Sequence, residues 1–404
     1  MKILSFKRRL FRRFVRDDED PIDASKKMIS LIQGLVGISD VFGDRERSFS
    51  CLSIVGIVLT TTFVYVGNVS QVLYLLRVLP DRLEAFKACN CISATSVPLS
   101  TFVFMWTARN SLQKVFAMCR LGVTFASKEN LAHAALLRTL HKSQRLAWLV
   151  IANQGFSHFI YLVAPLLLTI FGNGRYLPTT PGDTYGLSPK YESPFFEITF
   201  ILTTIATAFS AINQTGYIIL FITLVGHELG NFYAISETLS NLHETMLDRN
   251  IPEDEKQTTI HNTLVFCIKH HQFVRKYHAM LKDLYQTIFG AHFLMMTVVL
   301  VTTLQTLNAW DVRNTILTGV TGILPLFLYC FGGELVISAG EEMAAALYSC
   351  GWELMPASQA RLVLMMLRVT QKPLHLTAAN IFVMNRETFG DVAQTVYKIY
   401  TVFN

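Results

Sequence analysis

Five polar side chains near the end of this 404-residue chain are spaced so that they could conduct ions across a membrane. They are Glu387, Asp391, Gln394, Lys398 and Thr401. Their intervals of four, three, four and three residues place them on one stripe of an α-helix, because residues three and four apart share a helix face. Charged side chains at membrane depth usually face a bundle interior or a water-filled passage. A pore or water channel is therefore the first functional hypothesis.

The opposite side of this segment is apolar and completes an amphipathic helix from about Asn380 to Phe403. Its apolar residues repeat at intervals of three and four: Phe389, Val392, Val396, Ile399 and Phe403. We include Val402 among the candidate pore-lining residues. A second interpretation stays open, in which the five polar residues, here called the polar stripe, hydrogen-bond to neighbouring helices and form a packing seam.

The rest of the chain has the composition of a membrane protein. Hydrophobic residues make up 51% of it and charged residues only 16%, outside the usual range of soluble domains. Windows without Lys, Arg, Asp or Glu reach the roughly 20 residues that a transmembrane helix requires. There are six: 48–76, 88–108, 146–174, 198–227, 284–310 and 314–333. With the C-terminal helix they predict an all-α, polytopic membrane protein with seven transmembrane helices.

The distribution of positive charge predicts a cytosolic N-terminus and an extracellular C-terminus. In that orientation 27 of the 35 Lys and Arg residues lie on the cytosolic side, 11 of them in the first 47 residues. Membrane proteins follow this bias of basic residues towards the cytosol. The triplet Asn68-Val69-Ser70 is a glycosylation acceptor that would then lie at the outer end of the first span. We therefore expect Asn68 to carry a glycan.

We expect the chain to be organised in four consecutive parts. The first is a basic cytosolic segment, the second holds the first six spans and the ligand pocket, the third is a cytosolic anchor segment, and the fourth is the seventh, pore-lining helix. Their boundaries are 1–47, 48–335, 336–372 and 373–404. Two long cytosolic connections, 109–145 and 228–283, keep the periodicity of helices with one apolar face. Such faces need a partner, so we expect a cytosolic helical anchor bundle that forms an oligomer interface.

The basic N-terminal segment could contact membrane lipid. Residues 2–16 read KILSFKRRLFRRFVR, and their apolar residues recur at helical spacing: Ile3, Phe6, Leu10 and Phe14. Such a segment can lie on an anionic membrane surface. The alternative is a solvated basic tail that only determines topology.

The sequence lacks the short motifs that would indicate an enzyme or a metalloprotein. It contains no G-x-x-x-x-G-K, H-E-x-x-H or C-x-x-C motif. None of its seven cysteines falls in the outer loop 172–194, so an extracellular disulfide is not expected. We expect no catalytic residues, no metal or other cofactor, and no nucleic-acid partner.

The C-terminal third of the chain resembles the insect odorant receptors. The resemblance rests on Glu341-Glu342, Tyr348, Trp352, Arg361, Leu367-Arg368, Gln371-Lys372-Pro373-Leu374, Leu376-Thr377-Ala378, Glu387-Thr388-Phe389 and Thr395-x-Tyr397, which stand in the order and spacing of that family's tail. His227-Glu228-Leu229-Gly230-Asn231, at the end of the fourth span, is similar to a His-containing segment of the family. Upstream of residue 195 the similarity is one of pattern only.

This resemblance implies a subunit of a tetrameric ligand-gated, non-selective cation channel in the plasma membrane of olfactory sensory neuron dendrites. The last helix would line the pore, and a short helix at about 357–369 would join the anchor between subunits. The chain lacks the longer loop between spans four and five and the tail of the family's shared co-receptor. It resembles an odour-specific subunit that forms heterotetramers with that co-receptor. Lys398 departs from the pattern, because a cation near the outer mouth makes a homotetramer of this chain a poor conductor.

The resemblance places the odorant pocket in the outer half of the membrane, among spans two to six. Depth along these spans yields eleven candidates: Phe86, Asn90, Ala94, His158, Tyr161, Phe200, Thr203, Thr207, Thr302, Thr306 and Ile316. For each of them, packing between helices is the alternative role. The outer halves of these spans contain no acidic residue, so we expect a small neutral volatile rather than a cationic amine.

Three other classes of membrane protein share features with this chain. A G-protein-coupled receptor would have the opposite orientation, an outer-loop disulfide, and Asp-Arg-Tyr and Asn-Pro-x-x-Tyr motifs, which the sequence lacks. A gustatory receptor channel would end in Thr-Tyr followed by apolar residues and Gln-Phe, unlike the final TVYKIYTVFN. A transporter would favour paired broken half-helices in repeated positions, for which the sequence gives no support.

Overall fold

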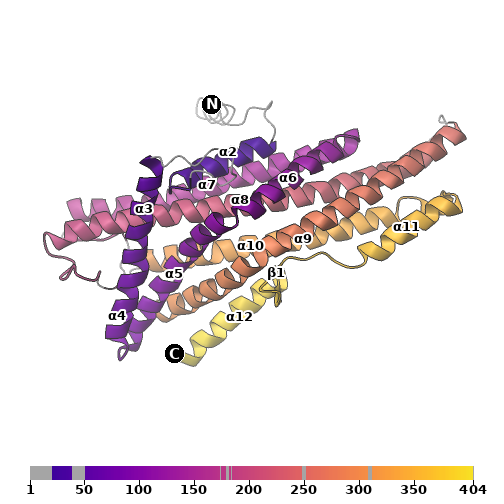
Figure 1. Ribbon diagram of the computed structural model, residues 1–404. Helices are drawn as coiled ribbons and strands as arrows, with labels where there is room; N and C mark the ends of the chain where they lie inside the picture. The colour runs from indigo at the N-terminus through magenta and orange to yellow at the C-terminus, as the bar shows by residue number, and fades with distance from the viewer. Residues whose placement is uncertain are drawn as a thin grey trace, which may run out of the picture.

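The computed structural model describes an almost entirely helical protein (Figure 1). The described residues are 21–38, 51–172, 174–178, 182, 184–247, 252–307 and 312–403. Within them, six helices are long and apolar enough to cross a membrane. The predicted all-α membrane fold is confirmed, and the amphipathic C-terminal helix follows these six.

The helices follow one another with short connections in most places. In chain order they are α2 (Pro21–Gly34), α3 (Cys51–Val64), the π-helix η1 (Tyr65–Val69), α4 (Ser70–Val78), α5 (Arg82–Thr107), α6 (Arg109–Ala126), α7 (Asn130–Phe171), α8 (Phe195–Leu247), α9 (Glu253–Gln305), α10 (Val312–Tyr348), the 3-10 helix η2 (Trp352–Leu354), α11 (Ala357–Thr370) and α12 (Arg386–Phe403). The strands β1 (Thr377–Ala378) and β2 (Phe382–Val383) form a small antiparallel pair. The helices α3, η1 and α4 continue directly into one another, so the first span reaches Val78.

Helices α8 and α9 run along the length of the molecule in Figure 1. Each has 53 residues, which at about 1.5 Å per residue is more than twice the hydrocarbon thickness of roughly 30 Å. Both helices therefore extend beyond a membrane, and helix covers most of the connections 109–145 and 228–283. The short helix expected at about 357–369 corresponds to α11.

Helix α8 is the centre around which the other helices pack. Every residue from Asn213 to Phe232 is buried, as expected for a helix that is surrounded on all sides. It contacts α2, α3, α5, α7, α9 and α10. The polar residues between Asn213 and Phe232 are consequently enclosed between helices rather than exposed to lipid or water.

Helix α2 was not predicted from the sequence. Its buried residues Ile22, Ile29 and Gln33 share one face, which packs against α7 and α8. A Cβ atom at Gly216 of α8 would lie 2.2 Å from Nε2 of Gln33, so the missing side chain makes room for this contact. The proposed membrane-surface residues Ile3, Phe6, Leu10 and Phe14 lie outside the described residues.

The C-terminal helix begins later than predicted. A helix from about Asn380 is wrong, because Ala379 and Asn380 have φ angles of 51° and 58°, in the left-handed region that interrupts a right-handed helix. They form the turn of the hairpin that joins β1 to β2. Asn385 then caps the helix: its Oδ1 accepts a hydrogen bond of 2.9 Å from the backbone N–H of Thr388.

The hairpin is held by two glycines, Gly290 of α9 and Gly333 of α10, here called the glycine socket. A Cβ at Gly290 would lie 2.7 Å from Cβ of Ala379, and a Cβ at Gly333 would lie 2.0 Å from the carbonyl oxygen of Met384. The backbone N–H of Ala379 also donates a 2.8 Å hydrogen bond to the carbonyl of Gln286 on α9. The glycine socket therefore lets the hairpin that precedes α12 pack closely against α9 and α10.

Candidate functional site

A cavity of about 180 Å³, here called the main cavity, lies among α3, η1, α4, α5, α7, α8, α9 and α10. For comparison, an apolar cavity of about 150 Å³ in another protein binds benzene. Residues with polar side chains in its lining are Gln71, Asn90, Thr95, His158, Tyr161, Thr207, Ser210, Gln214 and Thr318. Among the described residues, no Asp, Glu, Lys or Arg lines it. The main cavity is therefore suited in size and charge to a small neutral molecule.

Five of the eleven residues predicted from depth line the main cavity. They are Asn90, Ala94, His158, Tyr161 and Thr207. They come from α5, α7 and α8, which are separated in sequence and brought together only by the fold.

Five other predicted pocket residues, whose side chains are described, do not line the main cavity. Thr203 is fully buried and donates a 2.7 Å hydrogen bond to the carbonyl of Thr199. Thr306 bonds the carbonyl of Thr302 at 2.9 Å, and the ring of Phe200 packs against that of Phe196. Phe86 and Thr302 are also absent from the lining. The side chain of Ile316 lies outside the described part of the chain.

Ser210 and Gln214 line the main cavity but were missed by the sequence analysis. With Thr207 they lie three and four residues apart, on one face of α8. This spacing was visible in the sequence. They were missed because only the outer half of each span was considered, whereas the main cavity continues deeper along α8.

Asn90 connects α5 to α9 beside the main cavity. Its Nδ2 lies 3.0 Å from the carbonyl oxygen of Val299 and 2.9 Å from Oγ1 of both Thr302 and Thr303. The side chain is only 1% exposed. Because a carbonyl oxygen can only accept, the amide orientation is determined by this contact. Asn90 therefore holds two helices together as well as lining the main cavity.

The loop between α7 and α8 packs against the first span next to the main cavity. Oε1 of Gln71, which lines the main cavity, accepts a hydrogen bond of 3.0 Å from the backbone N–H of Gly182. Oγ of Ser70 accepts one of 3.3 Å from the backbone N–H of Tyr185, and the hydroxyl of Tyr65 donates to the carbonyl of Tyr185. These contacts attach the loop to η1 and α4.

Asn68 lies within the first span rather than at its outer end. The helix continues for ten residues to Val78, and Oδ1 of Asn68 lies 3.5 Å from Oγ of Ser96 on α5. Its Nδ2, the atom to which a glycan would be attached, is buried. The structure therefore argues against the predicted glycan, because the acceptor atom faces a neighbouring helix instead of water.

The polar stripe of α12 is exposed on the surface of this single chain. All five of its residues are exposed, as is Val402, whereas Val392 and Val396 on the opposite side are buried. Helix α12 contacts α9 and α10. The apolar side therefore attaches α12 to α9 and α10, and the polar stripe lies on the surface of the chain.

A polar core lies further along α8 and α9, in five residues: His227, Glu228, Asn231, His270 and His278. Nδ1 of His278 lies 2.6 Å from Oε1 of Glu228, and Nε2 of His270 lies 2.8 Å from Oδ1 of Asn231. All five are at most 5% exposed. The segment His227 to Asn231, which carried part of the family resemblance, thus joins α8 to α9.

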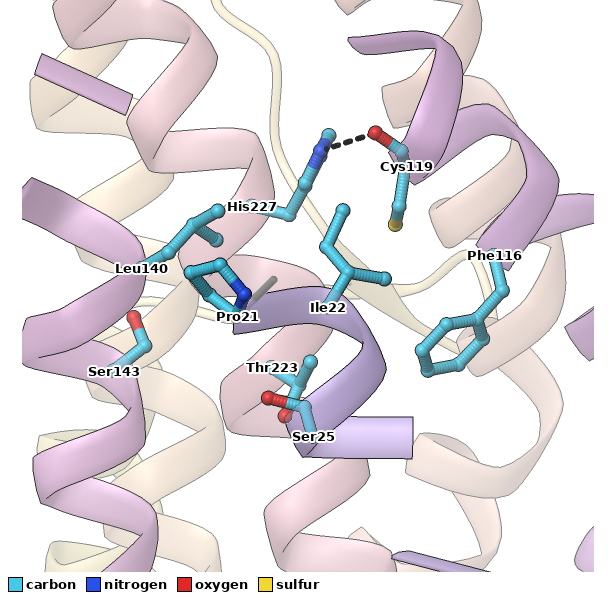
Figure 2. A pocket seen from close by; sticks show the side chains of 9 residues that line it. All are labelled: Pro21, Ile22, Ser25, Phe116, Cys119, Leu140, Ser143, Thr223 and His227. Atoms are coloured by element: carbon cyan, nitrogen blue, oxygen red, sulfur yellow. Dashed lines mark hydrogen bonds between the residues drawn. The ribbon is translucent and has the colours of Figure 1, made fainter. Parts of the chain in front are cut away.

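A small cavity of about 10 Å³ lies beneath the first turn of α2, next to His227 (Figure 2). Nε2 of His227 donates a 2.9 Å hydrogen bond to the carbonyl oxygen of Cys119 on α6, because that oxygen can only accept. A cavity of this volume accommodates about one water molecule. It is too small for an organic ligand, so the main cavity is the candidate binding site.

Comparisons with known proteins agree with this architecture. The family model described as 7tm Odorant receptor matches residues 81–397. Odorant receptor 22c of Drosophila melanogaster is 23% identical over 330 residues, which cover 76% of this chain and 79% of that protein. Odorant receptor 10a of the same organism is 27% identical over 219 residues, 50% of this chain and 51% of that protein.

Solved structures with the same fold are also known. The insect olfactory receptor OR5 from Machilis hrabei matches with a TM-score of 0.72 at 16% identity, over 95% of this chain and 99% of that chain. A second structure of that receptor, in complex with eugenol, matches with a TM-score of 0.71, also at 16% identity and with the same coverage. At this level of identity the likeness shows a common fold.

Proposed function

Because this chain belongs to the odorant receptor family, we propose that it is the odorant-binding subunit of a heteromeric ligand-gated cation channel. The main cavity is the observation that carries the proposal. It lies among helices from most of the bundle, has the volume for a small volatile, and has no charged residue among the described residues that line it. A related fold accommodates eugenol in OR5 of Machilis hrabei, which supports a small organic ligand here.

The proposed orientation has the N-terminus in the cytosol and the C-terminus outside the cell, at the plasma membrane. The segments 1–47, 109–145 and 228–283 together hold 24 of the 35 Lys and Arg residues, which supports it. The main cavity then lies towards the outside, where an odorant arrives. The long ends of α8 and α9 lie in the cytosol with α11 and provide the proposed anchor between subunits.

The proposed pore is formed by α12 from each subunit of a heterotetramer with the family's co-receptor. The exposed polar stripe with Val402 would face the conduction path, while Val392 and Val396 hold α12 against its own subunit. A path that contains Lys398 in every subunit would repel cations at its outer end. Co-receptor subunits without that cation would reduce this barrier, which favours the mixed assembly.

The main cavity and the start of α12 are connected through α9 and α10. On α9, Met296 lines the main cavity and Gly290 belongs to the glycine socket, six residues away, or about 9 Å along the helix. On α10, Gly322 and Gly333 have the same two roles. A ligand that prefers one arrangement of these helices would thereby shift α12, and only such a differential preference can open a channel.

Expression of this chain with and without the co-receptor tests the proposal. We expect odour-evoked cation current only when both are present, with this chain labelled at the cell surface. Full-size current from this chain alone would overturn the partner assignment. Surface expression of both chains without current from a broad panel of volatiles would contradict the receptor-channel function and favour the transporter alternative.

A further inference from the structure

Two hydroxyl groups in the main cavity wall, those of Thr95 and Thr207, donate their hydrogens to the backbone. Oγ1 of Thr95 donates to the carbonyl of Gly67 at 2.7 Å or of Cys91 at 2.8 Å. Oγ1 of Thr207 donates to the carbonyl of Thr203 or Thr204, both at 2.9 Å. A hydroxyl has one hydrogen and two lone pairs. Towards the main cavity, Thr95 and Thr207 therefore offer acceptors.

The side-chain amide hydrogens of Asn90 are also donated to other protein groups. Its amide hydrogens are directed to Val299, Thr302 and Thr303 on α9. The remaining polar atom is the acceptor Oδ1.

His158 adds a further acceptor. Its Nδ1 lies 2.8 Å from the carbonyl oxygen of Gln154, one turn earlier on α7. That oxygen cannot donate, so Nδ1 carries the hydrogen. In a neutral imidazole the ring nitrogen that carries no hydrogen is an acceptor, so Nε2 of His158 offers a lone pair.

Gln214, like Ser210, is a lining residue whose side chain makes no hydrogen bond within the described part of the chain. It is 8% exposed, lies on the central helix α8, and borders the main cavity. A buried amide without hydrogen bonds carries a desolvation penalty. A ligand with a polar group would remove that penalty by bonding to it.

Taken together with the proposed function, on which this inference rests, the geometry points to small neutral alcohols or phenols as the preferred ligands. A ligand hydroxyl can accept from Nε2 of Gln214 and donate to an acceptor such as Nε2 of His158. An aldehyde or ether of equal size can only accept. It would satisfy Gln214 but leave the acceptors that face it without hydrogens.

The test compares matched ligands on the complete receptor, co-expressed with the co-receptor. Within each of two sets the ligands have the same number of non-hydrogen atoms: benzyl alcohol, benzaldehyde and anisole, and hexanol, hexanal and methyl pentyl ether. We expect each alcohol to reach half-maximal current at a concentration about three- to tenfold below that of its aldehyde and ether, the effect of one hydrogen bond. Aldehydes or ethers that activate as well as the alcohols would overturn the ligand class.

Two variants assign the effect to the named residues. Gln214→Met and His158→Phe each keep side-chain volume but remove hydrogen bonding, and each should bring the alcohol-to-ether ratio towards one. The matched control is Thr203→Val, which removes a hydroxyl from α8 outside the main cavity and should leave the ratio unchanged. Because both ligands are measured on the same variant, differences in expression cancel.

The outcomes separate this inference from the proposed function. Current evoked by ethers and aldehydes but not by alcohols contradicts the ligand class and leaves the receptor function in place. A strong preference for alcohols that persists in both variants contradicts the roles of Gln214 and His158. Absence of current from every volatile contradicts the proposed function itself.

Discussion

Nδ1 of His278 on α9 lies 2.6 Å from Oε1 of Glu228 on α8, with both residues at most 5% exposed. This contact joins the two longest helices of the chain within the polar core. Oε2 of Glu228 is buried without a partner in the described chain, so His278 is the main compensation for burial of this carboxylate.

His278→Leu should therefore destabilise the protein strongly. Removing one partner of a buried pair leaves the other unpaired and costs about 3–5 kcal/mol. The measurement is the thermal midpoint of the detergent-solubilised receptor complex. The double variant Glu228→Leu/His278→Leu should recover most of the loss, and His261→Leu, at an exposed position of α9, should have little effect. If the double variant is no more stable than the single one, the pair does not have this role.

Gly290→Ala and Gly333→Ala should impair gating. Either Cβ would collide with the hairpin before α12, and overpacking of this kind costs about 1–3 kcal/mol. We expect reduced maximal current from receptors that still reach the surface, measured as current per surface-labelled receptor. Gly340→Ala is the control, because nothing lies within 4 Å of its Cβ position on α10. Equal currents in all three variants would show that close packing at the glycine socket is not required for gating.

Charge changes on the polar stripe should alter ion permeation and leave odour preference unchanged. Asp391 and Lys398 are seven residues apart, or about 10 Å along one face of α12. A fixed charge in a narrow passage changes ion energies more than in bulk water. Asp391→Asn and Lys398→Ala should each alter rectification or relative cation permeability, to a modest extent because co-receptor subunits dilute the effect. Normal permeation with lost co-receptor assembly would identify the polar stripe as a packing seam.

A change in the main cavity should have the opposite effect. Tyr161→Phe alters the lining of the main cavity but lies on α7, away from the proposed pore. We expect a new order of preferred odorants with unchanged permeability ratios, measured by dose–response curves and reversal potentials. A shift in reversal potential without a change in odour order would contradict the separation of the two sites.

Asn68→Gln should leave the gel mobility of the receptor unchanged, because Nδ2 of Asn68 is buried against α5. Gly186→Asn supplies the positive control and tests orientation. It creates an acceptor triplet with Leu187 and Ser188 in the outer loop, at an exposed position with a φ of 82°, which asparagine tolerates. This variant should gain a glycosidase-sensitive shift. The opposite result would be a glycosidase-induced mobility shift in the unaltered chain that is lost in Asn68→Gln. It would show that Asn68 is accessible during synthesis although it is buried in the folded chain.

The sequence by itself determined the membrane-spanning helical fold. Long segments without charged residues are more stable in lipid than in water. A backbone in lipid must make its hydrogen bonds internally, as in a helix. The polar stripe could also be read directly, since residues on one helix face follow from spacing alone. Depth and residue type were enough to select Asn90, Ala94, His158, Tyr161 and Thr207 for the wall of the main cavity.

Only the tertiary structure decided which polar residues face the main cavity. Thr203 and Thr207 are one helical turn apart and of the same type, yet Thr203 is enclosed by packing and Thr207 borders the main cavity. The difference depends on the position of neighbouring helices. The hairpin that precedes α12 likewise packs against the glycine socket, to which Ala379 and Asn380 bring a left-handed turn. Asn68 matches an acceptor motif, but a motif is local, whereas burial depends on atoms that are distant in sequence.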